Sequence, residues 1–237
     1  MPRYFSIRKY NINLSTPLIC SVFFGISDAA YAQNVTTFSP SQDLVFSNII
    51  SDNGASMSVV KTGIAKQTLT NINTYTGSTT ISEGTLALAG TASISQSSVV
   101  HNNANFDISG IAQPIDVSIK SLDGSGTVTL GTSTLNITNG NSTLGNTFSG
   151  VVSGTHTGGL TISGGSETLT GTNIYTGATT VTSGASLIVS GGGSLNGTYG
   201  IHNDGTVVLD NGHVTLTAAA NSNGSLTLRN GSSLDAQ

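Results

Sequence analysis

The chain has 237 residues, of which 36% are hydrophobic, only 8% are charged and 30 are glycine. Disordered chains usually combine low hydrophobicity with high charge, so this composition excludes a disordered chain. Solvated helices need charged residues on their outer face, and between Asp123 and Asp204 the only charged residue is Glu167, which excludes amphipathic helices there. Short runs of Val, Ile and Thr between Gly and Asn residues therefore predict an all-β chain.

The first residues belong to a different class of segment. The chain starts with the positive residues Arg3, Arg8 and Lys9. An apolar core follows over 18–26, and Ala30-Tyr31-Ala32 then forms a small-x-small motif. These are the three parts of a secretory signal peptide. A short membrane anchor is the alternative, but the apolar run falls short of a spanning helix. We predict a signal peptide over residues 1–32, cleaved after Ala32, and a mature chain that begins at Gln33.

The cysteine count and the charge balance limit the chemistry of the mature chain. Cys20 is the only cysteine and lies inside the apolar run after Ile19, where a lipoprotein signal would need a small residue. The mature chain therefore has no thiol for a disulfide or a Cys-based metal site. Removing the signal also removes three cations and Asp28, so the mature charge is (7 − 3) − (11 − 1) = −6. Such a chain lacks the basic footprint of a nucleic-acid binder.

Two segments of the mature chain repeat nearly the same phrase. The first copy runs over about 46–90 and the second over about 148–191. The identical positions are Phe46 and Phe148, Leu69 and Leu169, Tyr75-Thr76-Gly77 and Tyr175-Thr176-Gly177, Thr79-Thr80 and Thr179-Thr180, and Gly84 and Gly184. A repeat of this length is typical of a stacked architecture, in which each unit is one piece of supersecondary structure.

Within each copy apolar residues alternate, as Leu86 and Leu88 do in the first and Leu187 and Val189 in the second. A period of two indicates strands with one buried face. Pairs of Asn or Asp with Gly separate such runs and predict corners. The pairs are Asp123-Gly124, Asn139-Gly140, Asn196-Gly197, Asp204-Gly205, Asn211-Gly212, Asn223-Gly224 and Asn230-Gly231.

Short strands with frequent corners fit a sandwich, a barrel or a solenoid, and the internal repeat favours the solenoid. Thr, Asn, Val and Ile stack well on copies of themselves, and charges would repel in such ladders. The aromatic content of 5%, with no Trp, argues against a sandwich core. We expect residues 33–237 to form one β-helical domain of mainly parallel strands. With roughly 20–25 residues per coil it has eight or nine coils and a length of about 40 Å.

The residues also resemble a known family. "LTGTNIYTGATTVTSGASLIVSGG" in the second copy is similar to the autotransporter-associated β-strand repeat of bacterial autotransporter passenger domains. The first copy departs from that pattern at residues 64–67, where a Gly-rich turn is expected. The resemblance implies a right-handed parallel β-helix, exported through the inner membrane to the outer membrane, the cell surface or the medium.

The same resemblance implies a translocator β-barrel as partner, and the sequence as given does not include one. We therefore expect either a truncated passenger or one that other export machinery delivers. If no translocator is supplied, the chain stays in the periplasm.

No motif predicts catalytic, cofactor-binding or metal-binding residues. His101, His156, His202 and His213 are scattered, whereas a metal site needs converging ligands. No Gly-x-Ser-x-Gly elbow or phosphate-binding Gly-rich loop occurs. The alternative enzyme class is a β-helical polysaccharide lyase or hydrolase, which gathers charged residues on one face. The four permanent cations of the mature chain are Lys61, Lys66, Lys120 and Arg229, and its acids are well separated. Convergence of two or three charged residues in one groove would favour the enzyme.

Two further patterns admit a ligand-binding interpretation. Tyr75 and Tyr175 could stack on sugars, but a residue repeated in every unit usually serves the stack, so we predict a structural role. Thr-x-Thr pairs can order water when they share one register on one exposed face. The pairs are Thr127 and Thr129, Thr168 and Thr170, and Thr215 and Thr217. Their irregular spacing favours ordinary strand propensity.

The sequence thus predicts an exported, non-enzymatic passenger segment with a structural or adhesive role at the bacterial cell surface. A β-helical enzyme and a truncated, non-functional passenger fragment stay open as alternatives. A host or surface glycan or protein is a possible ligand, and nothing in the sequence identifies it.

Overall fold

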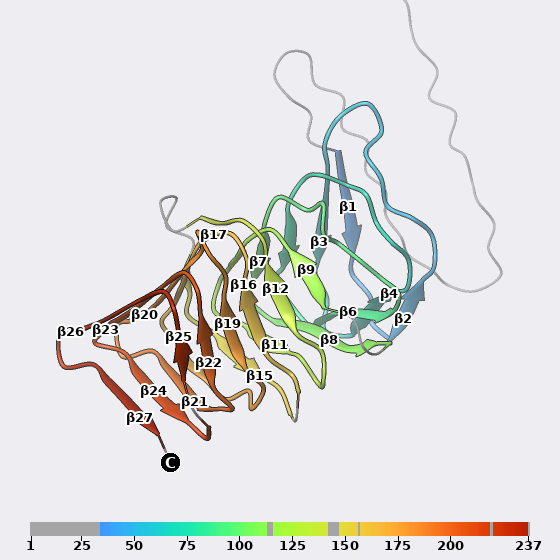
Figure 1. The fold of residues 1–237 in the computed structure, drawn as a ribbon. Coiled ribbons are helices and arrows are strands. Elements are labelled where there is room, and N and C mark those ends of the chain that lie inside the picture. Colours follow the sequence, from blue (N-terminus) through green and yellow to red (C-terminus); the bar gives the residue numbers. More distant parts are fainter. Residues whose placement is uncertain (1–33, 113–115, 142–146, 156, 219, 237) are drawn as a thin grey trace, which may run out of the picture.

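The computed structural model describes residues 34–112, 116–141, 147–155, 157–218 and 220–236. All strand pairs in these residues are parallel. The described residues contain no helix, and hence no helix that is long and apolar enough to cross a membrane. The strands stack along one axis from β1 at one end to β26 and β27 at the other (Figure 1). The predicted all-β solenoid of parallel strands is confirmed. Its right-handed winding stays a prediction.

The solenoid has three faces, and the chain visits them in turn. The first face contains β1 (Asn34–Phe38), β3 (Met57–Lys61), β5 (Thr79–Ile81), β7 (Val100–Asn102), β10 (Leu122–Asp123), β13 (Gly140–Asn141), β14 (Thr147–Phe148), β17 (Gly165–Leu169), β20 (Ser186–Ser190), β23 (Thr206–Asp210) and β26 (Ser225–Arg229). The second face contains β2 (Leu44–Phe46), β4 (Lys66–Leu69), β6 (Thr85–Gly90), β8 (Asn105–Ile111), β11 (Thr127–Thr129), β15 (Val151–Ser153), β18 (Thr172–Asn173), β21 (Ser194–Thr198), β24 (His213–Leu216) and β27 (Ser233–Ala236). The third face contains β9 (Val117–Ile119), β12 (Leu135–Ile137), β16 (Leu160–Ile162), β19 (Thr179–Val181), β22 (Ile201–Asn203) and β25 (Asn221–Ser222).

Single bridges and side chains continue each face where the regular sheets break. On the first face a parallel bridge between Gly124 and Phe148 joins β10 to β14. On the second face the Val152 amide donates to Asn173 Oδ1 at 2.9 Å, which joins β15 to β18. Before β9 the third face continues as irregular segments, with a bridge between Ile72 and Ser93. The stack is therefore continuous along the described chain.

The solenoid makes about ten turns, so the predicted eight or nine coils were too few. On the first face Val59 pairs with Thr79, Thr79 with Val100, and Val100 with Leu122. These steps are 20, 21 and 22 residues long, near the short end of the predicted coil length. Short turns are possible because many corners take only two or three residues, some with a glycine or asparagine at positive φ.

The core consists of aliphatic columns that run along the axis. Leu69 pairs with Leu88 on the second face, and Leu169 pairs with Val189 on the first. All four side chains are fully buried, together with Leu86 and Leu187. The alternation seen in the sequence is thus the alternation of inward and outward side chains, and each turn buries its leucines against those above and below.

Four of the seven predicted corners lie wholly between strands, two include the end residue of a strand, and one lies inside a strand. Asn211 and Asn230 adopt positive φ of 54° and 56°, as expected for Asn in tight corners. Asn196-Gly197, in contrast, lies inside β21, where the pairing with β24 shifts register between Asn196 and Thr198. That pair therefore marks a bulge within a strand, which is the other conformation that glycine serves in sheets.

The two sequence copies lie on different faces of the solenoid. In the first copy Thr79–Ile81 is on the first face, whereas the matching Thr179–Val181 of the second copy is on the third. Likewise β4 is on the second face and its equivalent β17 on the first. Each copy spans about two turns, because Phe46, Leu69 and Leu88 follow one another on the second face. The repeat therefore encodes strands and corners but not the face on which they lie.

Replacing Leu88 or Val189 by Asp is expected to cost about 3–5 kcal/mol, because each change buries an unpaired charge in an aliphatic column. The half-buried Ser78 and Thr80 of the first copy supply controls. Asp at either of these two positions is expected to cost less than about 1 kcal/mol. Chemical denaturation followed by circular dichroism measures both. Equal losses at core and control positions would contradict the assigned burial.

Candidate functional site

The most elaborate polar arrangement is the corner that both copies share, and it begins with a buried asparagine. Asn73 Oδ1 accepts from the Ile50 amide at 2.9 Å, and its Nδ2 donates to the carbonyls of Asn71 and Ser93 at 2.8 and 3.1 Å. The side chain therefore connects three successive turns where the third face has no regular strand. Its hydrogen bonds satisfy backbone groups that burial would otherwise leave unpaired.

Asn173 repeats this geometry in the second copy. Its Oδ1 accepts from the Val152 amide at 2.9 Å, and its Nδ2 donates to the carbonyls of Gly171 and Ser194 at 3.0 Å each. The two asparagines are only 2% and 1% exposed. Identical bonding on two different faces shows that the arrangement belongs to the repeat itself.

A buried tyrosine completes the corner. The Tyr75 hydroxyl lies 2.6 Å from Thr79 Oγ1, which lies 2.9 Å from Ser97 Oγ, and Ser97 Oγ donates to the Gly77 carbonyl at 3.0 Å. In the second copy Tyr175, Thr179, Thr198 and the Gly177 carbonyl form the same chain. Burial raises the pKa of both tyrosine hydroxyls well above their usual value. Neither ring offers a face to a sugar, since both side chains are at most 1% exposed.

Ser97 and Thr198 are the members of this network that sequence reasoning missed. They lie outside the two copies, 18 and 19 residues after the threonine that each contacts. The available signal was the turn length, because a small hydroxyl residue about one turn after the repeated Thr occupies the next level of the stack.

The glycine of Tyr-Thr-Gly is required by the close approach of the preceding turn. A Cβ on Gly77 would lie 2.3 Å from the Met57 carbonyl oxygen, and one on Gly177 would lie 2.5 Å from that of Gly158. Both contacts are with backbone, so a side chain could not be accommodated by rotation. In Asn-x-Tyr-Thr-Gly the asparagine and the glycine therefore touch the neighbouring turns directly, and the tyrosine is linked to the next turn through a threonine.

Lys61 is the one fully buried cation among the described residues. Its Nζ donates to the backbone carbonyls of Thr62, Gly63 and Glu83 at 3.0, 2.7 and 3.0 Å. Desolvation lowers the pKa of the ammonium, and the charge of Glu83 partly opposes this shift. Since all three hydrogen-bond donors of the ammonium are used within the stack, Lys61 closes a corner rather than facing a substrate.

The described histidines lie on the outside and contact acids singly. His101 contacts Asp123 at 2.7 Å and His202 contacts Asp204 at 3.0 Å. His213 is 3.7 Å from Asp235 and also bonds Ser233 and Thr215. His156 lies outside the described residues. Within the described ranges no three His, Cys, Asp or Glu side chains are grouped so that they could hold a metal ion.

The other residues singled out in the sequence are dispersed. Thr168 is on the first face, whereas Thr127 and Thr215 are on the second and four turns apart, so the Thr pairs form no single array. Lys120 donates to the Gln96 carbonyl at 2.8 Å. Arg229 forms an ion pair with Asp210 at 2.9 Å on the last two turns. Lys120 and Arg229 therefore lie on turns apart from each other and from Lys61.

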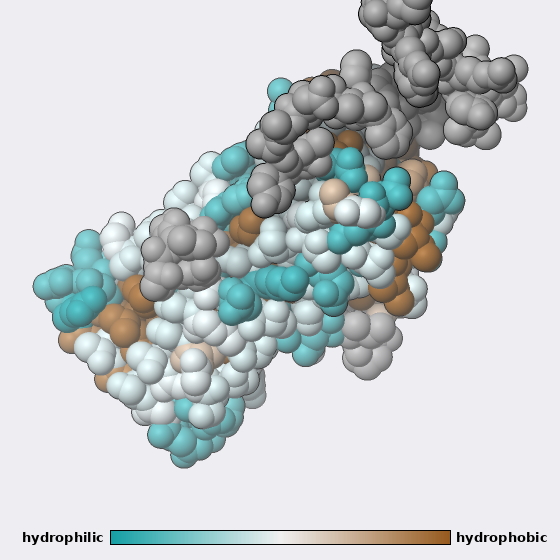
Figure 2. All heavy atoms as spheres, turned by 90° about the horizontal axis from the view of Figure 1, so that it is seen from above, coloured by the Kyte–Doolittle hydropathy of each residue, from teal (hydrophilic) through white to brown (hydrophobic). Residues whose placement is uncertain are grey.

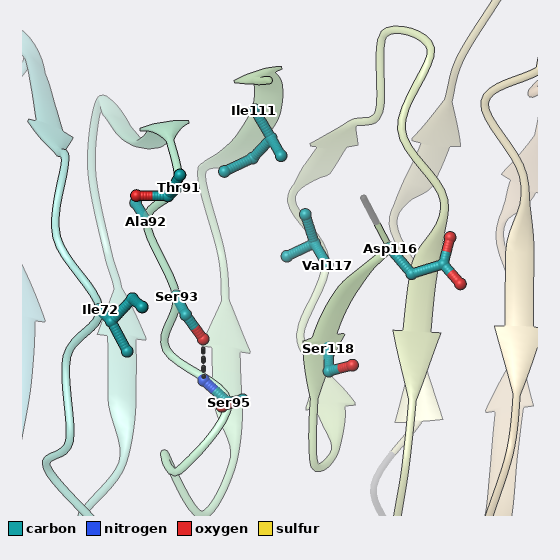
Figure 3. A pocket seen from close by; sticks show the side chains of 9 residues that line it. All are labelled: Ile72, Thr91, Ala92, Ser93, Ser95, Ile111, Asp116, Val117 and Ser118. Atoms are coloured by element: carbon teal, nitrogen blue, oxygen red, sulfur yellow. Dashed lines mark hydrogen bonds between the residues drawn. The ribbon is translucent and has the colours of Figure 1, made fainter. Parts of the chain in front are cut away.

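Two open grooves are large enough for a small ligand. One, of about 350 Å³, lies on the third face before β9 and is lined by Ile72, Ala92, Ile111, Asp116 and Val117 among others (Figure 3). The other, of about 310 Å³, lies beside Gly154 and Ile174. Asp116 is the only charged residue in the lining of either groove. The convergence of charges that would favour a lyase or hydrolase is thus not found in these two grooves.

Comparison with known families identifies the repeat. Residues 59–88 and 167–189 match the family described as Passenger-associated-transport-repeat. The chain carries passenger-associated transport repeats. Both matches lie inside the copies found in the sequence, and they match an autotransporter passenger with β-solenoid repeats, which confirms the resemblance. Comparison with curated proteins and with solved structures gave no match.

Removing the shared network is expected to destabilise the passenger repeat in a defined order. Asn173→Ala leaves an amide and two carbonyls without their bonds and is expected to cost about 2–4 kcal/mol. Tyr175→Phe removes a single hydrogen bond and is expected to cost about 1 kcal/mol. Tyr199, which is 63% exposed, gives the matched control, and Tyr199→Phe is expected to change stability by less than about 0.5 kcal/mol. Denaturant titration of the three variants tests the order. An Asn173→Ala loss as small as that of Tyr199→Phe would show that the network is not structural.

Proposed function

We propose that the chain is an exported, non-enzymatic passenger segment with a structural or adhesive role at a bacterial cell surface. The observation that carries this proposal is the pair of passenger-associated transport repeats built into a continuous solenoid of about ten turns. Residues 1–32 act as its cleavable signal peptide, and residues 33–237 are the exported domain. A translocator β-barrel, or other export machinery, is the partner that takes it across the outer membrane.

The surface of the solenoid supports contact rather than catalysis. Its middle is mostly white to teal, hence moderately to strongly hydrophilic, and apolar side chains, drawn in brown, gather toward the two ends (Figure 2). Exposed Val45, Ile49 and Ile64 belong to the first two turns, and exposed Leu226 and Leu228 to the last. A surface of hydroxyl and amide groups can add many weak contacts through multivalency without any single deep site.

One row of polar side chains suits such contact especially well. On the third face six outward residues pair in strict register from turn to turn, and we call them the third-face ladder: Ser118, Asn136, Thr161, Thr180, His202 and Asn221. Parallel strands place successive members about 4.8 Å apart. A repetitive ligand, such as a polysaccharide or an extended protein, could meet several of them at once. We therefore propose a repetitive polysaccharide or an extended protein as the class of ligand.

Export is tested first. In cells that supply the native neighbouring genes, the chain is expected in the outer-membrane or medium fraction. Protease added to intact cells is expected to digest it, and N-terminal sequencing of the undigested chain is expected to begin at Gln33. Ala30→Asp and Ala32→Asp together are expected to block cleavage, because the cleavage site requires small residues. A protein that stays in the cytoplasm, or an exported one that begins at Met1, would refute the export proposal.

Adhesion is tested with two surface variants of equal size. The first replaces Asn136, Thr161, Thr180 and His202 of the third-face ladder by Ala. The second replaces the corresponding first-face row by Ala: Ser166, Ser186, Thr206 and Ser225. If adhesion uses the ladder, binding of displaying cells to wells coated with polysaccharides or matrix proteins is expected to fall at least about tenfold in the first variant only, since multivalent contacts act together. Equal binding by both variants and the wild type would exclude the ladder. Degradation of the coating polysaccharide would instead support the enzyme.

A further inference from the structure

Glu167 is a buried carboxyl that the proposed function does not use. The side chain is fully buried in β17, and neither carboxyl oxygen has a hydrogen-bond partner within normal geometry. Buried carboxylates without partners are rare, because desolvation of the charged form costs far more than the burial returns. The residue therefore needs an explanation.

Pairing along the first face changes register at Glu167. The register between the sixth and seventh turns passes from Asn141 and Ser166 to Thr147 and Thr168. No described residue of the sixth turn pairs with Glu167. On its other side, Glu167 of the seventh turn pairs with Leu187 of β20 in the eighth turn. The carboxyl thus lies in the core beside this change of register.

The first copy shows what this position holds when it is neutral. Gln67 is the equivalent of Glu167, since it occupies the same place in β4, two residues before a buried leucine, and pairs with Leu86 of the next turn. Its Nε2 donates to the carbonyls of Leu44 and Thr68 at 3.3 Å each. A carboxamide therefore fits the interior as a donor, and a protonated carboxyl is the form of glutamate closest to it.

The surroundings of Glu167 oppose its ionised form. Among the strands packed against β17, the only titratable side chain is Asp123 of β10, which itself contacts His101; β13, β14, β16 and β20 carry none. Burial, and to a lesser extent the negative charge of Asp123, raise the pKa of Glu167 well above its usual range. The backbone N–H of Leu122 partly opposes the shift, although it does not reach normal hydrogen-bond geometry with either carboxyl oxygen. Among the described residues, no cation contributes to the shift in the pKa of Glu167.

We propose that Glu167 is a pH-sensitive switch in the middle of the solenoid: β17 stays stacked on β20 while the carboxyl carries its proton, and it loosens locally when the proton leaves to solvent. The sign follows from linkage. The stacked state binds the proton more tightly than the loosened state does, so stacking is complete below the ordinary carboxyl pKa of 4.5 and is lost as pH rises through the raised value.

Hydrogen exchange measured by mass spectrometry on the full chain tests the switch. After correction for intrinsic exchange, protection of the amides in 165–190 is expected to fall by up to about tenfold per pH unit between the ordinary carboxyl pKa and the raised pKa, and to level off above it, as loss of one proton requires. Protection of 66–88 is expected to stay constant. Glu167→Gln is expected to remove the pH dependence of 165–190 and to keep it protected throughout.

The chain supplies a reciprocal variant and a surface control. Gln67→Glu is expected to transfer the same pH dependence to 66–88, and a variant that folds in acid and loosens at higher pH supports the switch even if the loss spreads. Asp116→Asn removes an exposed acid and is expected to behave as the wild type does. Three results would overturn the proposal: wild-type protection of 165–190 that is independent of pH, pH dependence that survives in Glu167→Gln, or a Gln67→Glu chain that is equally unprotected at every pH.

Discussion

The constraint on which the structure depends is the short distance between parallel neighbouring turns. A rise of about 4.8 Å per turn brings every side chain against the one directly above and below it. Aliphatic residues gain from this arrangement, as in the column of Leu169, Val189 and Leu209. A charge gains only if it finds a partner, as Lys61 does with three carbonyls. The low charge content and the repeated corner glycines are both consequences of that spacing.

The same constraint explains which features the sequence could predict. Alternation at Leu86 and Leu88 and the echo of one phrase are local patterns, so they predicted the strands, the buried columns and the stacked fold correctly. The number of turns depends on how few residues each corner needs, which summed over the chain moves the count from eight or nine to about ten. Asn196-Gly197 was wrongly assigned to a corner, because the same two residue types suit a corner and a bulge equally well and the sequence does not distinguish them.

The candidate site divides in a similar way. A structural role for Tyr75 and Tyr175 followed from their repetition, and their burial agrees with it. Their hydrogen-bond partners one turn later, Ser97 and Thr198, were invisible because serine and threonine are abundant and pairing across turns is a long-range property. Glu167 was noticed only as an isolated charge. Its importance appears when the position is compared with Gln67, which requires knowing that both side chains lie inside the stack and that the pairing changes register beside Glu167.

The placement of the two copies on different faces has a consequence for how such chains change length over evolutionary time. An inserted segment need not amount to a whole number of turns, because a unit that begins one face later builds the same corner with the same hydrogen bonds, as Asn73 and Asn173 do. Duplication can therefore lengthen the solenoid in steps of one face, that is, of a third of a turn. Each such step rotates every outward residue beyond it by a third of a revolution, so insertions and deletions would redirect exposed rows while leaving the interior intact.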